Sequence, residues 1–281
     1  MHVGLHIRIT ESLNSLTEKA LRLELSFFQC FFSIKNTTAL LRPTPQEIAD
    51  FVAARRQHFG RLYAHGSYWI NLASVDHTGH YALDRELQLA RALEFTHLVV
   101  HPGSAKGAEK KEDGLDAAVR SINKALKKQP DIVLVLENTA HGNMTVGGDI
   151  HELAQIYAKL DFPERVAICL DTAHAHVYGY DIITQQGRSD FITLVDSTIG
   201  LSRVALLHVN DTYDACGSKL DRHQLLGQGS IGLEALQSFV TDPRLSHIPI
   251  LSEPPVTSED VEREQLAIMR SWYEVQTIKK G

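Results

Sequence analysis

Short runs of apolar, strand-type residues alternate along the chain with longer segments in which apolar and polar positions follow a helical period. β-Branched and aromatic residues are typical of strands, and turn residues mark the strand ends. The pattern predicts eight strands, at Val3–Ile7, Leu25–Phe31, Leu62–His65, His97–His101, Ile132–Glu137, Val166–Asp171, Val204–Val209 and Ile248–Glu253.

Helices are expected between most of these strands. Pro45 suits the first turn of a helix, and Ser15 with Glu18 has the spacing of a capping box. The expected helices are Ser15–Leu25, Pro45–His58, Leu83–Phe95, Asp113–Lys128, Gly148–Leu160, Leu233–Val240 and Ser258–Val275. Strand and helix in this alternation predict an α/β protein with a (β/α)₈ TIM barrel. No linker or change in composition interrupts the pattern, so residues 1–281 are expected to form a single domain.

Residues with metal-ligand chemistry stand at or beside the C-terminal ends of the expected strands. They are His65, His101, Glu137, Asp171, His208 and Glu253, and His6 ends the first strand. In a TIM barrel these strand ends converge on one rim, where active sites lie. A single histidine at such a position is more often a hydrogen-bonded core residue than a metal ligand. The two glutamates, however, end apolar strands, and a buried carboxylate needs a cationic neighbour. The set therefore predicts a metal centre of imidazole and carboxylate ligands, suited to Zn²⁺, Mn²⁺ or Fe²⁺.

Two further pairs lie in loops. Asp221 and His223 flank Arg222 ahead of a glycine-rich turn, and they could ligate one ion together. Asp171 and His174 stand at a strand-to-helix corner and could face two different ions. The ordinary alternatives are a solvated turn for the first pair and a helix cap for Asp171.

Overall charge and cysteine content narrow the picture only slightly. The formal net charge of −6 does not favour DNA binding, although three bound divalent cations would balance it. Three distant cysteines without a CxxC pair argue against disulfides and thiolate zinc sites, and they fit a reducing cytoplasm. No apolar run reaches the roughly 20 residues of a membrane helix, and the start lacks the features of a signal peptide. We therefore expect a cytoplasmic protein with no membrane partner.

Seven segments occur in the order found in the endonuclease IV family. They are YAHGSYWINL, VVHPGS, LENTA, LDTAHAHVYGYD, LHVND, DRHQLLGQGSIG and LSE. The chain resembles that family over nearly its whole length. The resemblance implies a hydrolase with a trinuclear zinc site that cuts double-stranded DNA 5′ to abasic sites, leaving a 3′-hydroxyl and a 5′-deoxyribose phosphate. It also implies trimming of blocked 3′ ends, and we expect the enzyme to act as a monomer.

The resemblance also implies a role for each candidate ligand. The first ion would be held by His65, His101 and Glu137. Glu137 would bridge to a second ion held by Asp171, His208 and Glu253. The third would be held by His174, Asp221 and His223. Glu137, Asp171 and Glu253 would then be the catalytic carboxylates. Asn138 and Asn210 would orient ligands or face a phosphate, and Asn210 and Arg222 would contact DNA.

The chain departs from the family pattern at three places. The first-strand histidine continues into IRITESLNS rather than small residues and paired glycines. Thr37 and Thr38 stand in the loop where the family carries an arginine that enters the DNA stack. Gly66 replaces the aspartate that usually follows the third-strand histidine. These changes spare the candidate ligands and concern the parts that distort DNA.

Tyr68 and Trp69 follow His65 and offer a substitute for the missing arginine. An abasic site lacks one base, so aromatic side chains can enter the gap while the duplex bends. The alternative is that both side chains pack beneath a loop.

Two other functions are compatible with these residues, because a fold does not fix a function. Sugar isomerases and epimerases place similar ligands on a related barrel around one or two metals, and they have no need of a third group such as His174, Asp221 and His223. A protein that recognises damaged DNA without cutting it would not need three ions.

Overall fold

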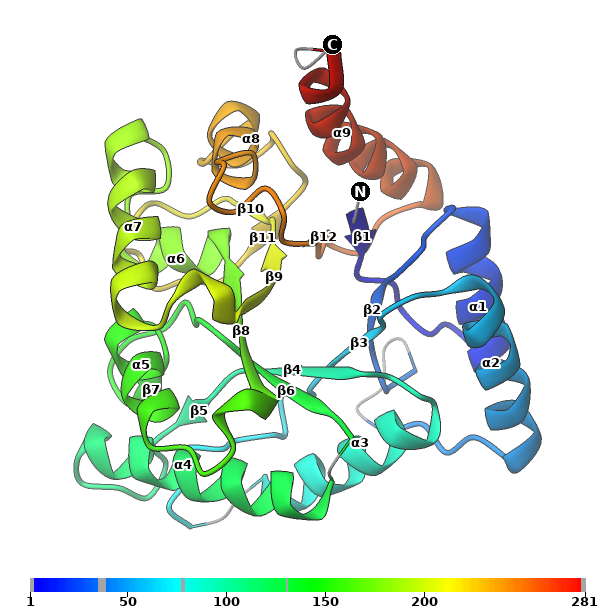
Figure 1. The fold of residues 1–281 in the computed structure, drawn as a ribbon, viewed down its shortest axis with the longest axis horizontal. Coiled ribbons are helices and arrows are strands. Elements are labelled where there is room, and N and C mark those ends of the chain that lie inside the picture. The colour runs from blue at the N-terminus through cyan, green and yellow to red at the C-terminus, as the bar shows by residue number, and fades with distance from the viewer. Residues whose placement is uncertain (1–2, 35–38, 77–78, 130, 279–281) are drawn as a thin grey trace.

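A computed structural model describes residues 3–34, 39–76, 79–129 and 131–278 of the chain. Eight parallel strands form its central sheet in the order β1-β12-β9-β8-β6-β4-β3-β2 (Figure 1). The strands are β1 (Val3–Leu5), β2 (Gln29–Phe31), β3 (Tyr63–His65), β4 (His97–Val100), β6 (Val133–Glu137), β8 (Val166–Asp171), β9 (Val204–His208) and β12 (Ile250–Ser252).

The first and last strands of that order meet, which closes the sheet. His6 and Gln29 form a parallel bridge, and the Ile7 amide donates to the Gln29 carbonyl at 2.8 Å. The closed sheet confirms the predicted TIM barrel, and each of the eight expected strands contains an observed one.

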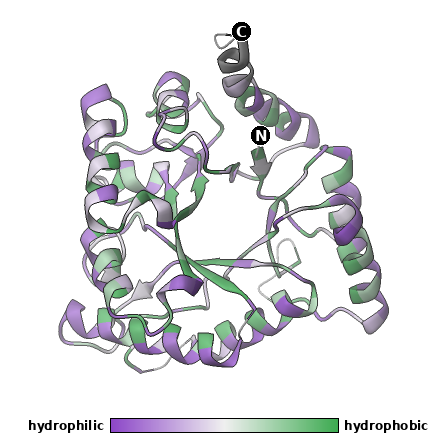
Figure 2. Cartoon of the chain, viewed as in Figure 1, coloured by the Kyte–Doolittle hydropathy of each residue, from purple (hydrophilic) through white to green (hydrophobic). Residues whose placement is uncertain are grey.

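Most of the helices surround the barrel on its outer side (Figure 1). The helices are α1 (Leu13–Arg22), α2 (Pro45–His58), α3 (His80–Ala92), α4 (Lys111–Lys128), α5 (Ile150–Ala158), α6 (Thr172–Tyr178), α7 (Gln185–Thr198), α8 (Leu233–Val240) and α9 (Glu259–Ile278), with 3₁₀ turns at Pro163–Arg165 and Leu201–Arg203. The short α6 follows β8 directly and is buried at the strand ends. Figure 2 shows mostly apolar strands and helices that mix apolar and polar residues, as expected of a helix with one buried face.

The helix predictions succeed to different degrees. Helices α2 and α8 have the expected bounds, and Pro45 lies in the first turn of α2. The predicted capping box of Ser15 and Glu18 is wrong, because Ser12 caps α1 and Ser15 makes the reciprocal bond. Helix α7 was not predicted, since it buries only Phe191, Ile192 and Val195 and its apolar period is weak.

The core has two layers that follow from the alternation of side chains along each strand. One layer lies between the strands and the helices. The other fills the barrel interior and consists of Phe27, Tyr63, Val99, Val135, Cys169, Leu206 and Leu251. β1 contributes Gly4 to this interior, where a Cβ atom would lie 2.7 Å from the Phe27 ring. The barrel is therefore packed, and its rim is the place for chemistry.

Two small antiparallel pairs lie beyond the strand ends. One joins β5 (Gly103–Ser104) to β7 (Thr145–Val146), and the other joins β10 (Asp211–Thr212) to β11 (His223–Gln224). The second pair carries His223 over the rim. None of the helices in the described ranges is long and apolar enough to cross a membrane.

Candidate metal centre

A two-residue step along each strand places the candidate ligands. Each follows an interior-facing core residue by two positions, so its side chain points into the same barrel one layer higher. The pairs are Tyr63 and His65, Val99 and His101, Val135 and Glu137, Cys169 and Asp171, Leu206 and His208, and Leu251 and Glu253. Six residues far apart in sequence thus form one ring, as the sequence predicted.

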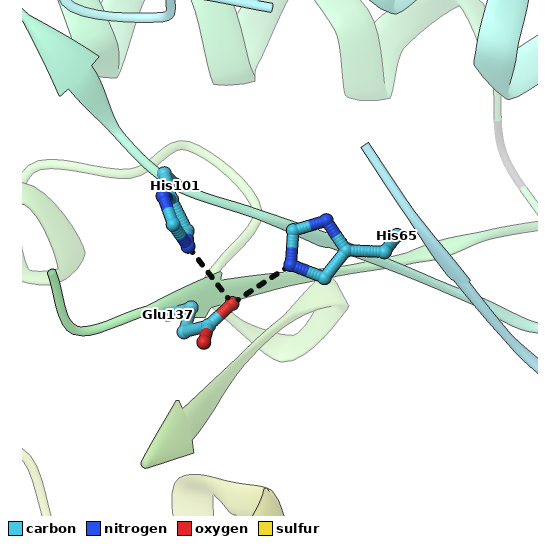
Figure 3. A group of neighbouring side chains, drawn as sticks. All are labelled: His65, His101 and Glu137. Atoms are coloured by element: carbon cyan, nitrogen blue, oxygen red, sulfur yellow. Dashed lines mark hydrogen bonds and ion pairs between the residues drawn. The ribbon is translucent and has the colours of Figure 1, made fainter. Parts of the chain in front are cut away.

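His65, His101 and Glu137 converge on one point (Figure 3). The Glu137 Oε2 atom lies 3.1 Å from His65 Nε2 and 3.2 Å from His101 Nε2. Glu137 is fully buried at the end of β6, and no arginine or lysine pairs with it among the described residues. The two imidazoles are therefore its main charge partners on this side.

The other oxygen of Glu137 belongs to a second cluster, formed with Asp171, His208 and Glu253. His208 Nδ1 lies 2.9 Å from Glu137 Oε1, 3.4 Å from Glu253 Oε2 and 3.9 Å from Asp171 Oδ2. Glu137 thus offers one oxygen to each of two neighbouring clusters, which is the arrangement expected of a bridging carboxylate.

A third cluster joins α6 to the β10–β11 hairpin. Asp221 Oδ2 lies 3.2 Å from His174 Nε2, and its Oδ1 lies 3.2 Å from His223 Nε2. Asp171 also borders this cluster, with Oδ2 3.8 Å from His223 Nε2. Asp171 Oδ1 meanwhile accepts from the His174 amide at 2.8 Å and caps α6. The helix cap and the cluster role predicted for Asp171 as alternatives therefore coexist.

The glycine-rich turn after His223 positions this hairpin. The buried Asp211 carboxylate accepts hydrogen bonds from the amides of Gly227, Gly229, Ile231 and Gly232. A Cβ atom on Gly229 would lie 2.3 Å from Asp211 Oδ1, so the close approach requires glycine. The turn thus binds a carboxylate of its own chain and holds Asp221 and His223 over the rim.

Hydrogen bonds on the outer side of three imidazoles show that the inner nitrogens are suited to bind a cation. His65 Nδ1 donates to the Gly66 carbonyl at 2.9 Å, and His174 Nδ1 donates to the Asn138 carbonyl at 2.8 Å. His208 Nε2 donates to Gln29 Oε1 at 3.0 Å. In a neutral ring the other nitrogen then directs a lone pair at a carboxylate oxygen. These two electron-rich atoms repel each other unless a proton or a metal ion lies between them.

Two further observations fit metal ions at these clusters. The Nε2 atoms of His101 and His223 are buried without hydrogen bonds among the described residues, although each lies 3.2 Å from a carboxylate oxygen. Two ligand atoms on one tetrahedral zinc ion stand about 3.4 Å apart, because each bond is about 2.0–2.1 Å long. The observed spacings are close to that value, and the nitrogen and oxygen donors suit zinc, manganese or iron.

Without metal, protonated histidines balance the carboxylates. Burial alone would lower the pKa of His65, but the hydrogen bond and charge of Glu137 raise this pKa to about 9. Burial also opposes protonation of His223, yet Asp221 and Asp171 raise its pKa to about 9. Burial raises the pKa of the Cys169 thiol well above its usual value, so this neighbour of Glu137 and His208 is a poor metal ligand.

Two asparagines hold the carboxylates. Asn138 accepts from the Asp171 amide at 2.7 Å and donates to the Asp171 carbonyl at 3.2 Å. Asn210 donates to Asp171 Oδ2 at 2.6 Å and to Glu253 Oε2 at 3.2 Å, and it accepts from the Glu253 amide at 2.7 Å. Asn210 is buried and its polar atoms are used, so it orients the two candidate ligands, while its expected contact with DNA stays a prediction.

Gln29 belongs to the site although the sequence did not single it out. Its Nε2 atom donates to Glu253 Oε1 at 2.6 Å and lies 3.0 Å from His6 Nδ1, while its Oε1 accepts from His208. His6 is also buried at the rim, with Nδ1 3.2 Å from Glu253 Oε1, and burial lowers the pKa of His6 to about 4. Gln29 follows the interior residue Phe27 by two positions, so the two-residue step was the signal that could have found it.

The candidate DNA-contacting residues lie outside the three clusters. Tyr68 and Trp69 are exposed, at 91% and 62% of their surface, so the alternative that both pack beneath a loop is wrong. Arg222 pairs with Asp214 through two guanidinium nitrogens and stays largely exposed. Thr37 and Thr38 lie outside the described residues. At Gly66 the space is filled by Val100 and Ile70, so the aspartate of the family pattern would not fit here without a shift.

The molecule resembles known proteins over nearly its whole length. Residues 18–272 match the family model described as xylose isomerase-like TIM barrel. A Halorhodospira halophila protein named "Probable endonuclease 4" is 36% identical over 264 residues, which are 92% of this chain and 89% of that protein. A Caenorhabditis elegans protein named "Apurinic-apyrimidinic endonuclease" is 33% identical over 76% of this chain and 56% of that protein. The crystal structure of endonuclease IV from Thermus thermophilus superposes with a TM-score of 0.84 at 31% identity, over 98% of this chain and 99% of that one.

Proposed function

This chain belongs to the endonuclease IV family of xylose isomerase-like TIM barrels, and on that premise we propose that it incises double-stranded DNA on the 5′ side of abasic sites. It is a DNA-cleaving hydrolase. The proposed reaction adds water to the phosphorus and breaks its bond to the 3′ oxygen, which leaves a 3′-hydroxyl and a 5′-deoxyribose phosphate. The same chemistry at a strand end would trim blocked 3′ termini.

The observation that carries this proposal is the set of three adjoining clusters around Glu137 and Asp171. We assign one divalent ion to His65, His101 and Glu137, a second to Glu137, Asp171, His208 and Glu253, and a third to His174, Asp221 and His223. When bound, such ions supply Lewis acidity toward the phosphodiester and the attacking water. Zinc is the expected metal, and manganese or iron could replace it in part.

The protein's own groups orient this centre. Glu137 joins the first two clusters through its two oxygens. Gln29 and Asn210 hold Glu253 from opposite sides, so its Oε2 atom stays directed toward His208. Asn138 fixes the Asp171 backbone at the strand end. Such fixed geometry needs no reorganisation during the reaction.

The third cluster separates this function from that of a sugar isomerase on a related barrel. An isomerase with one or two metals would not need Asp221 and His223 held over the rim by a dedicated hairpin. Every assigned ligand comes from one chain, so the proposed centre needs no residue of a second subunit.

A labelled duplex with a single abasic-site analogue tests the proposal. We expect one nick directly 5′ to the analogue, a 3′-hydroxyl at the nick, loss of cutting after metal chelation and recovery with zinc. An intact duplex serves as the control. Absence of the nick in metal-loaded protein, or equal cutting of intact DNA, would refute the function.

A further inference from the structure

The rim cavity contains one permanent cation that the metal chemistry does not use. This cavity has a volume of about 270 Å³ and is lined by candidate ligands, including His65, His101 and Glu253, together with Tyr68. Among the described residues that line it, Arg8 is the only lysine or arginine. Arg8 lies two residues after His6, which forms the bridge between β1 and β2. It belongs to the segment in which the chain departs from the small residues of its family.

Arg8 is held in place without being neutralised. Its Nη2 atom donates to the Pro254 carbonyl at 3.1 Å. Pro254 is followed by Pro255, so this acceptor lies in a segment whose φ angles are fixed by two proline rings. No ion pair among the described residues includes Arg8, and its side chain is half-buried. A guanidinium has five donors in a planar fork, so most of them remain available to a ligand.

The chemistry of the cavity points to a phosphate as that ligand. Arginine binds phosphate oxygens in a bidentate way, and an anchored fork loses little conformational entropy on binding. The candidate metal ligands surround the position of the reacting phosphodiester, whereas Arg8 lies beside them against Pro254. We propose that Arg8 binds a non-scissile phosphodiester next to the abasic site and so sets the register of the DNA strand on the rim. This assignment rests on the proposed function.

The matched variants are Arg8→Gln, Arg8→Lys and, as a control, Arg61→Gln. Arg61 is exposed and lines a separate cavity at the other end of the barrel, beside Tyr63 at the start of β3. The ligand is a duplex with one abasic analogue and a hydrolysis-resistant linkage at the scissile position, and fluorescence anisotropy gives its Kd. Zinc content is measured for every variant, since Arg8 is not a candidate ligand and its loss should leave the metals in place.

Arg8→Gln should raise Kd by about 10- to 100-fold, since a charge-assisted hydrogen bond is lost. It should reduce the slope of log K against log salt by about 0.9, the value for one phosphate contact. Arg8→Lys should retain the slope and bind more weakly than wild type, and Arg61→Gln should match wild type. Replacing single non-scissile phosphates by neutral methylphosphonates should weaken wild-type binding at one position where Arg8→Gln shows no further loss.

Two failures are distinguishable in this experiment. Wild-type protein that binds abasic duplex no better than intact duplex would contradict the proposed function. Wild-type protein that prefers abasic duplex, with the same Kd and salt slope in Arg8→Gln, would contradict only the assignment of Arg8. Loss of zinc from Arg8→Gln would also overturn it, because the effect would then come from the metal centre.

Discussion

Glu253 contacts side chains of two other strands at the barrel rim, Gln29 of β2 and His208 of β9. Its Oε1 atom accepts from Gln29, which closes the sheet, and its Oε2 atom faces His208 across the second cluster. Burial would raise the pKa of this carboxyl, but the charge of His208 and the hydrogen bond from His6 hold the pKa well below its usual value. The carboxylate is therefore ionised and ready to bind a metal ion near neutral pH.

Replacement of this carboxylate tests its assignment. Glu253→Gln should lower incision at least about 100-fold, since it removes a carboxylate that would hold the second ion and so help activate the attacking water, while abasic DNA still binds. Single-turnover incision and binding measurements give the two quantities. Glu262→Gln is the control, because Glu262 is a buried carboxylate that pairs with Lys19 away from the site. Near-normal cutting by Glu253→Gln would remove Glu253 from the centre.

Gln29 acts on ligands rather than as one. Gln29→Leu should weaken zinc binding by about 10- to 100-fold, the usual cost of losing an outer hydrogen bond to a ligand. Chelator competition measures the affinity, and ¹⁵N chemical shifts of His208 report which ring nitrogen carries the proton. Gln129→Leu changes a buried glutamine elsewhere and should alter neither. Unchanged affinity and unchanged His208 shifts in Gln29→Leu would contradict the role.

Among the structural elements, the repeated strand pattern could be predicted from the sequence, whereas contacts that form only once in the fold could not. The eight strands were found because each carries a run of apolar residues, and all but Leu25–Phe31 end at or beside a charged or imidazole group. Gln29 was missed because an uncharged amide gives no sign of metal chemistry, and its role depends on β1 meeting β2. The role of Asp211 was missed as well, since four amides of a distant turn reach its carboxylate only after folding. Helix α7 lacks a strong apolar face, so periodicity could not reveal it.

The segment after β3 is fixed at Ser67 and exposes the two aromatic side chains that follow, Tyr68 and Trp69. Ser67 donates through its amide and hydroxyl to the buried Glu86 of α3, and Tyr68 and Trp69 then project outward. Trp69→Ala should weaken binding to abasic DNA by about 5- to 150-fold, because base–aromatic stacking contributes roughly 1–3 kcal/mol. Binding to intact duplex should change far less, since phosphate contacts supply most of it.

Tryptophan fluorescence provides an independent measurement of the same contact. The other tryptophan, Trp272, is buried in α9 at 4% exposure, so an added duplex should alter mainly the emission of Trp69. Abasic DNA should change the signal of wild type and not that of Trp69→Phe. A change that persists in Trp69→Phe would exclude the contact.

For the whole molecule, the metal-free and metal-bound states should respond to pH in opposite ways. The pKa values of His65 and His223 rise from 6.5 to about 9 in the folded, metal-free protein. Their stabilising contribution is full below pH 6.5 and is lost as the pH rises toward 9. Zinc displaces those protons, so zinc affinity increases over the same interval.

The difference in Tm between zinc-loaded and chelator-treated protein should therefore widen from pH 6.5 to 9, by at least about 5 °C. Thermal unfolding of both forms across this interval measures it. A Tm difference that stays constant or narrows would mean that metal does not displace the protons of these histidines.

The proposed centre holds three divalent ions through nine side chains of one chain. Native mass spectrometry of protein purified without chelator counts those ions directly. We expect a monomer whose main species carries three zinc ions, and a main species with two in His223→Ala. A wild-type protein that binds one ion per chain, even with zinc in excess, would rule out the trinuclear centre and favour an isomerase-type centre.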